Sequence, residues 1–316
     1  MFGGVGLMVR QPGWHLRVSP GESDLIDADV DTTERVVGLL ASLRGARSVP
    51  PVSVRITSSV PFHAGLGSGT QLALALASAL ELLVTRRLPA DPWTLASIMN
   101  RAERSAIGTA GFRSGGFLVD HGLGADESSQ STANLDGSPS AARRIDRMMI
   151  PDTWRFVLVR PLATEGLCGE RERSYFARPR SMPQEIVHEL KNIILQRIVP
   201  AITAQEFAQF ASAIEDYGRK IGGWYAPVQG GIFSNAAIGT LANRLREHGV
   251  TGAAQSSWGP GIAIPARDAN HAEHIRTLVP ATIDGQPLQS MIVEPLNTGA
   301  TLRTEAISPT SDVAFA

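Results

Sequence analysis

The chain has 316 residues, of which 43% are hydrophobic and 19% charged, and its formal net charge is −1. This length is typical of two domains, and the composition is that of an ordinary water-soluble protein with enough apolar residues for sizeable cores. Its near-neutral charge excludes a general electrostatic attraction to nucleic acid or to an anionic membrane. The single cysteine, Cys168, excludes an internal disulfide and a zinc site built from several cysteines.

No targeting or membrane segment is expected. The first ten residues lack the basic segment and the long apolar core of a signal peptide. The longest apolar stretch, residues 72–84, is interrupted by Ser78 and Glu81 and is shorter than the roughly 20 residues that a membrane crossing needs. We therefore expect a soluble protein, without a membrane partner, in the reducing cytoplasm that its single cysteine suits.

The first half of the chain alternates predicted strands and helices. The expected strands cover residues 5–9, 15–18, 52–58 and 115–121, and the expected helices cover residues 31–44, 71–84 and 93–107. Asp31 and Glu34 have the spacing of a capping box, and Asp91 followed by Pro92 is typical of a helix start. Residues 122–142 are rich in glycine, serine and aspartate without periodicity, which predicts a surface loop.

The second half repeats this mixture. Strands are expected over residues 154–160, 253–257, 261–265 and 290–294, and helices over residues 183–197, 203–216, 235–247 and 269–278. The tail from Ser308 is expected to be disordered. This order predicts an α+β architecture in each half, with domains at residues 1–148 and 149–316.

Residues 61–70, PFHAGLGSGT, are the most informative segment of the chain because they lie where a strand turns into a helix. The first turn of a helix carries unpaired N–H groups and a partial positive charge, and glycines let an anion approach the backbone. Gly65, Leu66, Gly67, Ser68, Gly69 and Thr70 are therefore candidate phosphate-binding residues. A plain turn in which Ser68 or Thr70 caps the helix is the alternative. The segment is neither a Walker loop nor a dinucleotide fingerprint.

Three other glycine-rich segments are candidates for the same site. In residues 252–261, Ser256 and Ser257 can donate to phosphate and Trp258 offers a flat face, although a tight hairpin with a buried tryptophan fits equally well. Residues 222–231 suit neither a helix nor a regular strand, and form either a crossover or part of a pocket. Residues 108–116 are expected to form a turn in which Arg113 makes a bidentate anion contact.

The remaining polar residues give a weaker signal. Asp120 and His121 point to opposite faces if their strand continues, which argues against a catalytic pair. His63, inside the glycine loop, is the histidine that we select as a catalytic candidate. The alternating charges of residues 169–173 are expected to form a solvated face. No spacing indicates a dedicated metal cage, so Mg²⁺ is expected to arrive with a phosphorylated substrate.

The phosphate-loop motif of residues 61–69 resembles that of the GHMP kinase superfamily, which includes galactokinase, homoserine kinase and mevalonate kinase. Four further segments, at residues 2–9, 112–120, 226–231 and 255–260, make nearly the whole chain similar to the β-ribofuranosylaminobenzene 5′-phosphate synthase family within it. The resemblance implies a two-domain GHMP fold, with an N-terminal ribosomal-S5-like α/β domain and a C-terminal ferredoxin-like α+β domain.

The resemblance also implies a pentosyltransferase. In this family a ring carbon of 4-aminobenzoate or 4-hydroxybenzoate attacks C1 of phosphoribosyl pyrophosphate, with loss of pyrophosphate and CO₂, on the route to tetrahydromethanopterin. Mg²⁺ dependence and a homodimer go with the family. From residue type and motif position, we expect His63, Arg113 and Asp120 to take part in catalysis and Ser68 to bind metal. The residues expected on the same grounds to bind substrate are Tyr225, Gln229, Gln255, Ser256, Ser257 and Trp258.

Two departures from relatives bear on this expectation. Many GHMP kinases carry a Gly-x-x-Asp where residues 111–115 here read GFRSG, and the missing acid favours the synthase over a kinase. Family members usually begin with a further strand upstream of residues 2–9, so we expect either a misassigned start or a first sheet without one edge strand. An ATP-dependent small-molecule kinase and a catalytically silent phosphate-binding protein are the alternatives.

Overall fold

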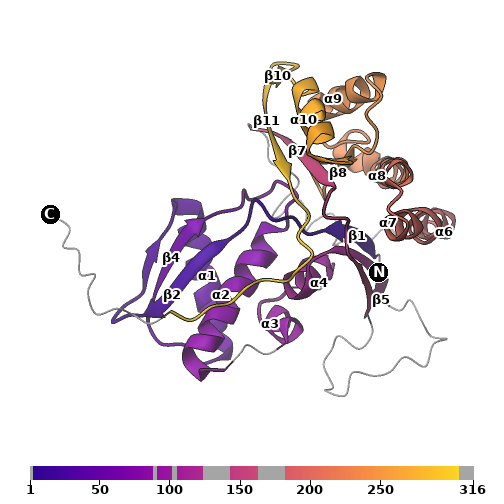
Figure 1. Ribbon diagram of the computed structural model, residues 1–316. Coiled ribbons are helices and arrows are strands. Elements are labelled where there is room, and N and C mark those ends of the chain that lie inside the picture. Colours follow the sequence, from indigo (N-terminus) through magenta and orange to yellow (C-terminus); the bar gives the residue numbers. More distant parts are fainter. Residues whose placement is uncertain (1–2, 88–90, 102–104, 124–142, 163–181, 306–316) are drawn as a thin grey trace, which may run out of the picture.

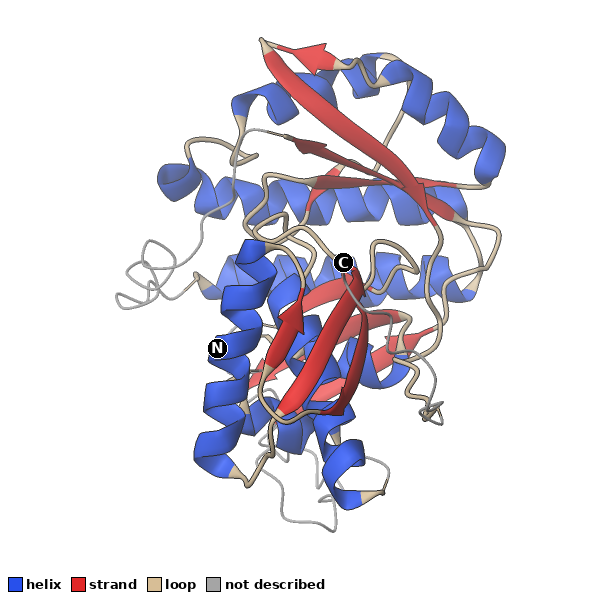
Figure 2. Cartoon of the chain, turned by 90° about the vertical axis from the view of Figure 1, so that its left-hand side faces the viewer, coloured by secondary structure: helices blue, strands red, loops and turns tan. Residues whose placement is uncertain are grey.

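The computed structural model describes residues 3–87, 91–101, 105–123, 143–162 and 182–305 (Figure 1). Helices and strands mix in both halves of the chain, which confirms the predicted α+β class (Figure 2). Cys168, residues 169–173, the tail from Ser308 and nearly all of the predicted loop at 122–142 lie outside the described residues.

The N-terminal half contains a three-stranded sheet in the order β2–β4–β3, whose central strand leads into the glycine loop. β4 is antiparallel to β2 and parallel to β3. The sheet and its two long helices are β2 (His15–Pro20), β3 (Leu25–Asp27), α1 (Val30–Ala46), β4 (Val52–Ser58) and α2 (Ser68–Thr85). Val52 and Val54 share one face of β4 because strand residues alternate, and both are fully buried in a core with α1 and α2.

A second sheet of the N-terminal half has the order β1–β5–β6, with both pairs antiparallel. Its elements and the helices beside it are β1 (Gly4–Leu7), α3 (Pro92–Ile98), α4 (Ile107–Ser114), β5 (Phe117–Leu123) and β6 (Arg143–Met148). α4 packs tightly against β1: a Cβ on Gly6 would lie 2.2 Å from Cγ2 of Ile107, and one on Gly111 would lie 2.3 Å from Sδ of Met8. These glycines therefore permit a close helix–strand approach.

The C-terminal half is built on a five-stranded antiparallel sheet in the order β10–β11–β7–β9–β8. Its strands are β7 (Arg155–Pro161), β8 (Ala254–Gln255), β9 (Ile262–Ala266), β10 (Thr282–Ile283) and β11 (Gln286–Val293). The helices are α6 (Gln184–Ile193), the π-helix η2 (Ile194–Ile198), α7 (Val199–Thr203), α8 (Phe207–Gln229), α9 (Ala236–Glu247) and α10 (Ala269–Leu278). Val157 and Val159 of β7 pack with Ile238 of α9 and Ile275 of α10 in one buried core.

The two halves share a second core. Phe156, which alternates with Val157 along β7, belongs to a cluster that also holds Phe117 and Val119 of β5. Phe210 of α8 lies at its centre, with ring centroids 6.0 Å from Phe117 and 6.4 Å from Phe156. Residues on both sides of the predicted boundary after residue 148 are thus buried together.

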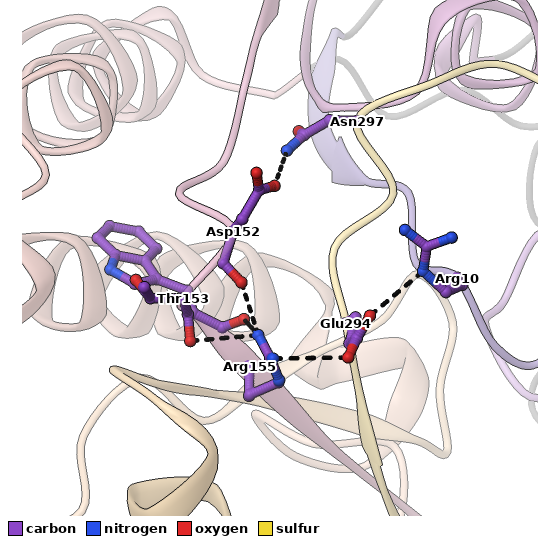
Figure 3. Close-up of polar contacts among 7 residues, drawn as sticks. Arg10, Asp152, Thr153, Arg155, Glu294 and Asn297 are labelled. Carbon is purple, nitrogen blue, oxygen red and sulfur yellow. Dashed lines mark hydrogen bonds and ion pairs between the residues drawn. The ribbon is translucent and has the colours of Figure 1, made fainter.

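The segment that follows β11 returns to the N-terminal half, as the yellow trace in Figure 1 shows. The backbone N–H of Arg10 donates to the carbonyl of Glu294 over 2.9 Å. The Glu294 carboxylate also forms ion pairs with Arg10 at 3.2 Å and Arg155 at 3.5 Å (Figure 3). One carboxylate of the C-terminal half therefore joins strand β7 to the chain that leaves β1.

Asn297 extends this connection. Its side chain accepts from the backbone N–H of Ile150 over 3.0 Å and donates to the carbonyl of Ile150 over 2.8 Å. It also donates to Asp152 over 3.0 Å (Figure 3). Two residues on, a Cβ on Gly299 would lie 2.1 Å from the carbonyl oxygen of Arg113, at the end of α4. The returning segment is thus fixed to both halves at the junction of α4 and β5.

The predicted start of the first helix is wrong by two residues. α1 is capped by Asp29, whose carboxylate accepts from the backbone N–H of Thr32 over 2.9 Å. This bond lowers the pKa of Asp29. Asp29 has the extended backbone that a cap requires, whereas Asp31 already lies in the first turn.

Three predictions near glycine-rich segments are also wrong. The helix expected over residues 93–107 has Asp91 as its N-cap residue and begins at Pro92, as predicted, but it ends at Ile98, and the side chain of Asp91 makes no capping bond. The expected turn at 108–116 is mostly the helix α4. α8 likewise continues to Gln229, through most of the segment that was expected to be non-helical. The glycine bias there reflects packing, since a Cβ on Gly222 would lie 2.2 Å from the carbonyl oxygen of Ile232.

Helix α2 is the one helix of the described chain that is long and apolar enough to cross a membrane by length and composition. Leu72, Leu74 and Leu76 are each almost fully buried within the N-terminal core. The apolar character of α2 is therefore explained by its place in this core.

Candidate functional site

The glycine loop lies between β4 and α2, as predicted. Gly67 is the N-cap of α2 in the left-handed conformation, with φ +66°, and no side chain makes a capping bond there. The expectation that Ser68 or Thr70 caps the helix is therefore wrong. Ser68 is the first helical residue and is 5% exposed. An uncapped helix start leaves backbone donors of the first turn for an anion.

Two aromatic side chains, Trp14 and Phe62, pack at the glycine loop. Nε1 of Trp14 donates to the carbonyl of Ser68 over 2.9 Å. Its ring lies 5.4 Å from that of Phe62, centroid to centroid. Trp14 belongs to the loop before β2, so a residue more than fifty positions earlier fixes the first turn of α2. No motif around Trp14 predicts this role.

His63 lies at the entrance of the loop with a left-handed backbone, φ +57°. Its Nε2 is 2.8 Å from a guanidinium nitrogen of Arg35 in α1. A guanidinium group only donates, so Nε2 accepts and the ring proton of this arrangement is on Nδ1. Arg35 also covers the ring of Phe62, with Cζ 4.0 Å from the centroid. The catalytic role of His63 stays a prediction; its position beside the loop is clear.

The segment 255–261 of the C-terminal half packs directly on the glycine loop. Oγ of Ser256 donates to the carbonyl of Gly65 over 2.6 Å. A Cβ on Gly65 would lie 2.1 Å from the backbone oxygen of Ser256, and one on Gly261 would lie 3.0 Å from that of Ala64. The two glycine-rich segments that the sequence singled out therefore meet in the structure.

Gln229 and Gln255 connect the loops of the C-terminal half to one another. Nε2 of Gln255 donates to Oε1 of Gln229 over 3.1 Å and to the carbonyl of Ser257 over 3.1 Å. Gln229 in turn donates to the carbonyls of Gly231 and Ile232, each over 2.9 Å. These bonds indicate that both glutamines position backbone around the site. The predicted contact of Gln229 and Gln255 with substrate stays a prediction.

Tyr225 and Trp258 form an aromatic pair at the same seam. Their ring centroids are 4.7 Å apart with an interplanar angle of 62°. Both rings are half-buried, whereas Ser257, with φ +53°, is exposed. Tyr225 comes from α8 and Trp258 from the segment beyond β8, so the pair offers an apolar edge beside the glycine loop.

Arg113 lies at the end of α4 that is remote from the glycine loop. The α4 end that contacts the loop helix is its N-terminus, where Gln71 donates to the carbonyl of Gly108 over 2.7 Å. Arg113 is five residues on, about 7.5 Å along the helix axis. Its side chain is 62% exposed and forms an ion pair with Asp91 at 3.3 Å.

Asp120 is 2% exposed, and its two carboxylate oxygens accept from the backbone N–H groups of Ala106 and Gly122, each over 3.0 Å. His121 instead contacts Asp146, with 2.8 Å between Nε2 and Oδ2. The two neighbours thus have separate partners, in agreement with the prediction that they do not act as a pair. The bonds of Asp120 fix the start of α4 and the end of β5.

Arg101 is a site residue that the sequence analysis missed. A guanidinium nitrogen of Arg101 lies 4.0 Å from the position of a Cβ on Gly69, in the first turn of α2. Its Nε is buried and has no hydrogen-bond partner among the described residues. Burial, and then the charge of Arg35, lowers the pKa of the Arg101 guanidinium. A lone arginine after a short helix carries no signal in the sequence.

These residues line one cleft of about 3290 Å³ between the halves. Ligand pockets are typically about 300–1,000 Å³, so the cleft exceeds what one small molecule fills. Its lining includes the whole glycine loop, Arg35, Arg101, Tyr225 and Trp258. Within the described ranges no group of three or more His, Cys, Asp or Glu is placed to hold a metal ion. Ser68 is the one residue proposed as a metal ligand, and a single hydroxyl does not form a cage.

Comparison with known proteins agrees with this geometry. The N-terminal domain of GHMP kinases matches residues 32–117, a range that contains the whole glycine loop. A homoserine kinase from Cytophaga hutchinsonii has a similar fold, with a TM-score of 0.64 at 12% identity, over 93% of this chain and 90% of that one. At this identity the likeness concerns the fold.

Sequence relatives come from archaea. The β-ribofuranosylphenol 5′-phosphate synthase of Methanothermobacter thermautotrophicus is 29% identical over 280 residues, 82% of this chain and 80% of its own. The enzyme of the same name from Archaeoglobus fulgidus is 31% identical over 218 residues, 67% of this chain and 66% of its own. The chain therefore belongs to the GHMP kinase superfamily and is a homologue of the β-ribofuranosylphenol 5′-phosphate synthases.

Proposed function

We propose that the chain is a pentosyltransferase that joins the ribose of phosphoribosyl pyrophosphate to the ring of a 4-substituted benzoate. The ring carbon that carries the carboxylate attacks C1 of the ribose, and the bond from C1 to pyrophosphate breaks with its electron pair on the leaving oxygen. The bond to the carboxylate then breaks, CO₂ departs and its electron pair restores the aromatic ring. The product is a β-ribofuranosyl benzene 5′-phosphate of the kind used in tetrahydromethanopterin biosynthesis.

The name of the relatives bears on the choice of acceptor. A β-ribofuranosylphenol 5′-phosphate carries a hydroxyl on its ring. Replacing a carboxylate by ribose gives that product from 4-hydroxybenzoate, whereas 4-aminobenzoate would give an aniline. We therefore favour 4-hydroxybenzoate as the acceptor of this chain.

One observation carries the proposal: an uncapped, glycine-lined helix start lies against a loop of the other half that bears an aromatic pair. The amides at the start of α2 suit the phosphates of the donor. Tyr225 and Trp258, 4.7 Å apart, offer an apolar edge for the benzoate ring. Because Ser256 bonds Gly65 directly, a donor on the loop and an acceptor on the aromatic edge would meet at the seam.

The electron balance explains why a strong base at the ring is not required. The pair that restores aromaticity comes from the bond to the carboxylate, so no side chain has to remove a ring proton. Asp120 is therefore not needed as a base at the ring, and its carboxylate oxygens accept hydrogen bonds from backbone amides. The main demands are to stabilise the departing pyrophosphate and to keep water away from the electron-poor C1. The loop amides meet the first demand and Tyr225 with Trp258 the second.

Mg²⁺ belongs to this proposal as a companion of the donor. Magnesium keeps several waters and is usually held by substrate phosphates together with one or two carboxylates. The loop offers the hydroxyl of Ser68, so the diphosphate and water would supply most of the ligands. When bound, Mg²⁺ would neutralise part of the diphosphate charge.

The test is an assay of the purified full chain with phosphoribosyl pyrophosphate, Mg²⁺ and carboxyl-labelled 4-hydroxybenzoate or 4-aminobenzoate. We expect labelled CO₂ and pyrophosphate in equal amounts, faster with the hydroxy acid. A parallel reaction with ATP and small alcohols tests the kinase alternative. Consumption of ATP without CO₂ release would overturn the proposal, and tight binding of the donor without turnover would favour a silent binding protein.

The homodimer and the cytoplasmic location stay predictions. Light scattering of the full chain at micromolar concentration tests the first, with a mass near twice the 33.7 kDa of one chain expected. Fractionation of the native host tests the second.

A further inference from the structure

The structure holds two arginines beside the glycine loop without any carboxylate partner among the described residues. Arg35 reaches His63 and the ring of Phe62, and no ion pair of Arg35 or Arg101 occurs in the described ranges. Several other arginines of the described chain do have a carboxylate partner: Arg44, for example, pairs with Asp24, and Arg55 pairs with Asp27. Two cations at one place, both half-buried, are unfavourable unless an anion joins them.

Arg101 is the more unusual of the two. Its Nε is buried and has no hydrogen-bond partner in the described part of the chain, although nearly all buried polar groups of proteins have one. Arg35 is close enough for its charge to help lower the pKa of Arg101, behind the effect of burial. The unpartnered Nε and the nearby charge of Arg35 therefore indicate that Arg101 lacks an anionic partner in the free protein.

The geometry connects this pair to the loop. The Arg101 guanidinium lies over Gly69, in the first turn of α2, and Arg35 lies over the residues that enter the loop. An anion on the amides of α2 would thus have Arg101 beside it and Arg35 near the entrance of the loop. A guanidinium forks onto phosphate oxygens and stays protonated at every working pH. Two such groups beside one helix start suit a chain of two phosphates better than one.

We propose that Arg101 and Arg35, with the first amides of α2, form the site for the diphosphate leaving group of the donor. This inference rests on the proposed function for the identity of the donor, but the diphosphate site itself can be tested without turnover. The two cations stabilise the charge that develops when the bond from C1 to pyrophosphate breaks. Arg101 is kept in an unfavourable, buried state that the diphosphate relieves.

The experiment is calorimetry of the full chain with inorganic pyrophosphate and, separately, inorganic phosphate, in EDTA so that Mg²⁺ takes no part. We compare Arg101→Met, Arg101→Lys and the control Arg276→Met, which removes an exposed arginine of α10 that pairs with Glu273. Wild type and control are expected to bind pyrophosphate more tightly than phosphate. Loss of charge-assisted bonds should weaken pyrophosphate binding by Arg101→Met on the order of 10- to 100-fold, and Arg101→Lys less.

A second readout separates this role from a structural one. Methionine removes a buried, unpaired charge, so the melting temperature of ligand-free Arg101→Met should equal or exceed that of wild type. Pyrophosphate should raise the melting temperature of wild type much more than that of the variant. Unchanged pyrophosphate affinity in Arg101→Met, or a ligand-free melting temperature several degrees below wild type, would overturn the inference.

The outcomes also separate this inference from the proposed function. If pyrophosphate binding depends on Arg101 but no CO₂ is released from either benzoate, the diphosphate site stands and the proposed reaction fails. If CO₂ is released at the same rate and with the same KM for phosphoribosyl pyrophosphate by Arg101→Met, the reaction stands and the diphosphate site fails.

Discussion

The contact between the glycine loop and the Ser256 segment can be tested with a matched pair of alanine substitutions. Gly65 and Gly67 both have left-handed backbones, with φ +77° and φ +66°. A Cβ on Gly65 would lie 2.1 Å from the carbonyl oxygen of Ser256, whereas a Cβ on Gly67 would meet nothing within 4 Å. The two variants share the backbone cost and differ in the contact across the seam.

The magnitudes follow from these environments. Alanine in a left-handed conformation costs about 1–2 kcal/mol, so Gly67→Ala should lower the free energy of unfolding by that amount. In Gly65→Ala the Ser256 carbonyl must also retreat by about 1 Å, from 2.1 Å to beyond 3.0 Å. This movement breaks the bond from Ser256 to Gly65, worth about 0.5–1.5 kcal/mol, and strains the packing. We expect Gly65→Ala to be less stable than Gly67→Ala by about 1–3 kcal/mol.

Urea titration of the full chain, followed by tryptophan fluorescence, measures the difference as a shift in midpoint at constant slope. Calorimetry with pyrophosphate is the companion measurement. The added methyl of Gly67→Ala enters the open space in front of the helix start, so this variant should lose pyrophosphate affinity despite its smaller loss of stability. Equal urea midpoints for the two variants would refute the contact between the halves on which the site depends.

Three further predictions concern the loop, the aromatic pair and an acid-sensitive ion pair. Ser68→Ala should weaken pyrophosphate binding in calorimetry by on the order of 1–3 kcal/mol, whereas Ser78→Ala, ten residues on in α2, should not; equal affinities would leave Ser68 without a ligand role. Trp258→Ala should raise KM for 4-hydroxybenzoate about 3- to 10-fold with KM for the donor nearly constant, and the reverse pattern in steady-state kinetics would contradict its role. The hydrogen bond from Arg44 lowers the pKa of Asp24 to about 2, below the value near 3.9 of an unfolded chain, so its stabilisation is complete above about pH 5 and is lost as the pH falls toward 2. The urea midpoint of Asp24→Asn should therefore fall less than that of wild type between pH 5 and pH 2.5. Parallel plots of the two midpoints against pH would contradict this.

The strand–loop–helix unit of the site was predictable because its signals are local. The alternation of residues 52–58, three glycines and an apolar run each specify a neighbouring piece of chain. The structure confirms β4 and α2 and moves only the start of α2, to Ser68. The contribution of segment 255–261 could be suspected from composition, but its contact with Gly65 is a property of the tertiary fold.

The errors arose where glycines serve packing. Gly111 and Gly222 lie inside helices because a neighbouring chain approaches to where a Cβ would be. In a single sequence this requirement cannot be distinguished from a turn, since both favour the same residue. The cap of α1 shows a milder case, in which Asp29 and Asp31 are both acceptable and backbone geometry selects the first.

Arg35 and Arg101 could not be found from the sequence for a different reason. Each lies in a segment with no motif, and 66 positions separate them. Their significance depends on what they lack, a carboxylate partner within the described chain, and on what they share, the approach to Gly69 and His63. Such a property exists only after folding.

The location of the site at a seam has a consequence for how its chemistry is specified. The helix start that attracts an anion belongs wholly to the N-terminal half, and any phosphorylated ligand can use it. The residues proposed to contact the benzoate ring, Tyr225 and Trp258, come from the C-terminal half. The shared core around Phe210 and the bonds of Asn297 hold these halves in register. A change of ligand can therefore arise from the C-terminal loops or from Arg35 and Arg101 of the N-terminal half, while the glycine loop and its supporting core stay the same. On this basis a fold shared with a kinase is compatible with a different reaction, and the arginines and aromatics around the loop are where the difference must be tested.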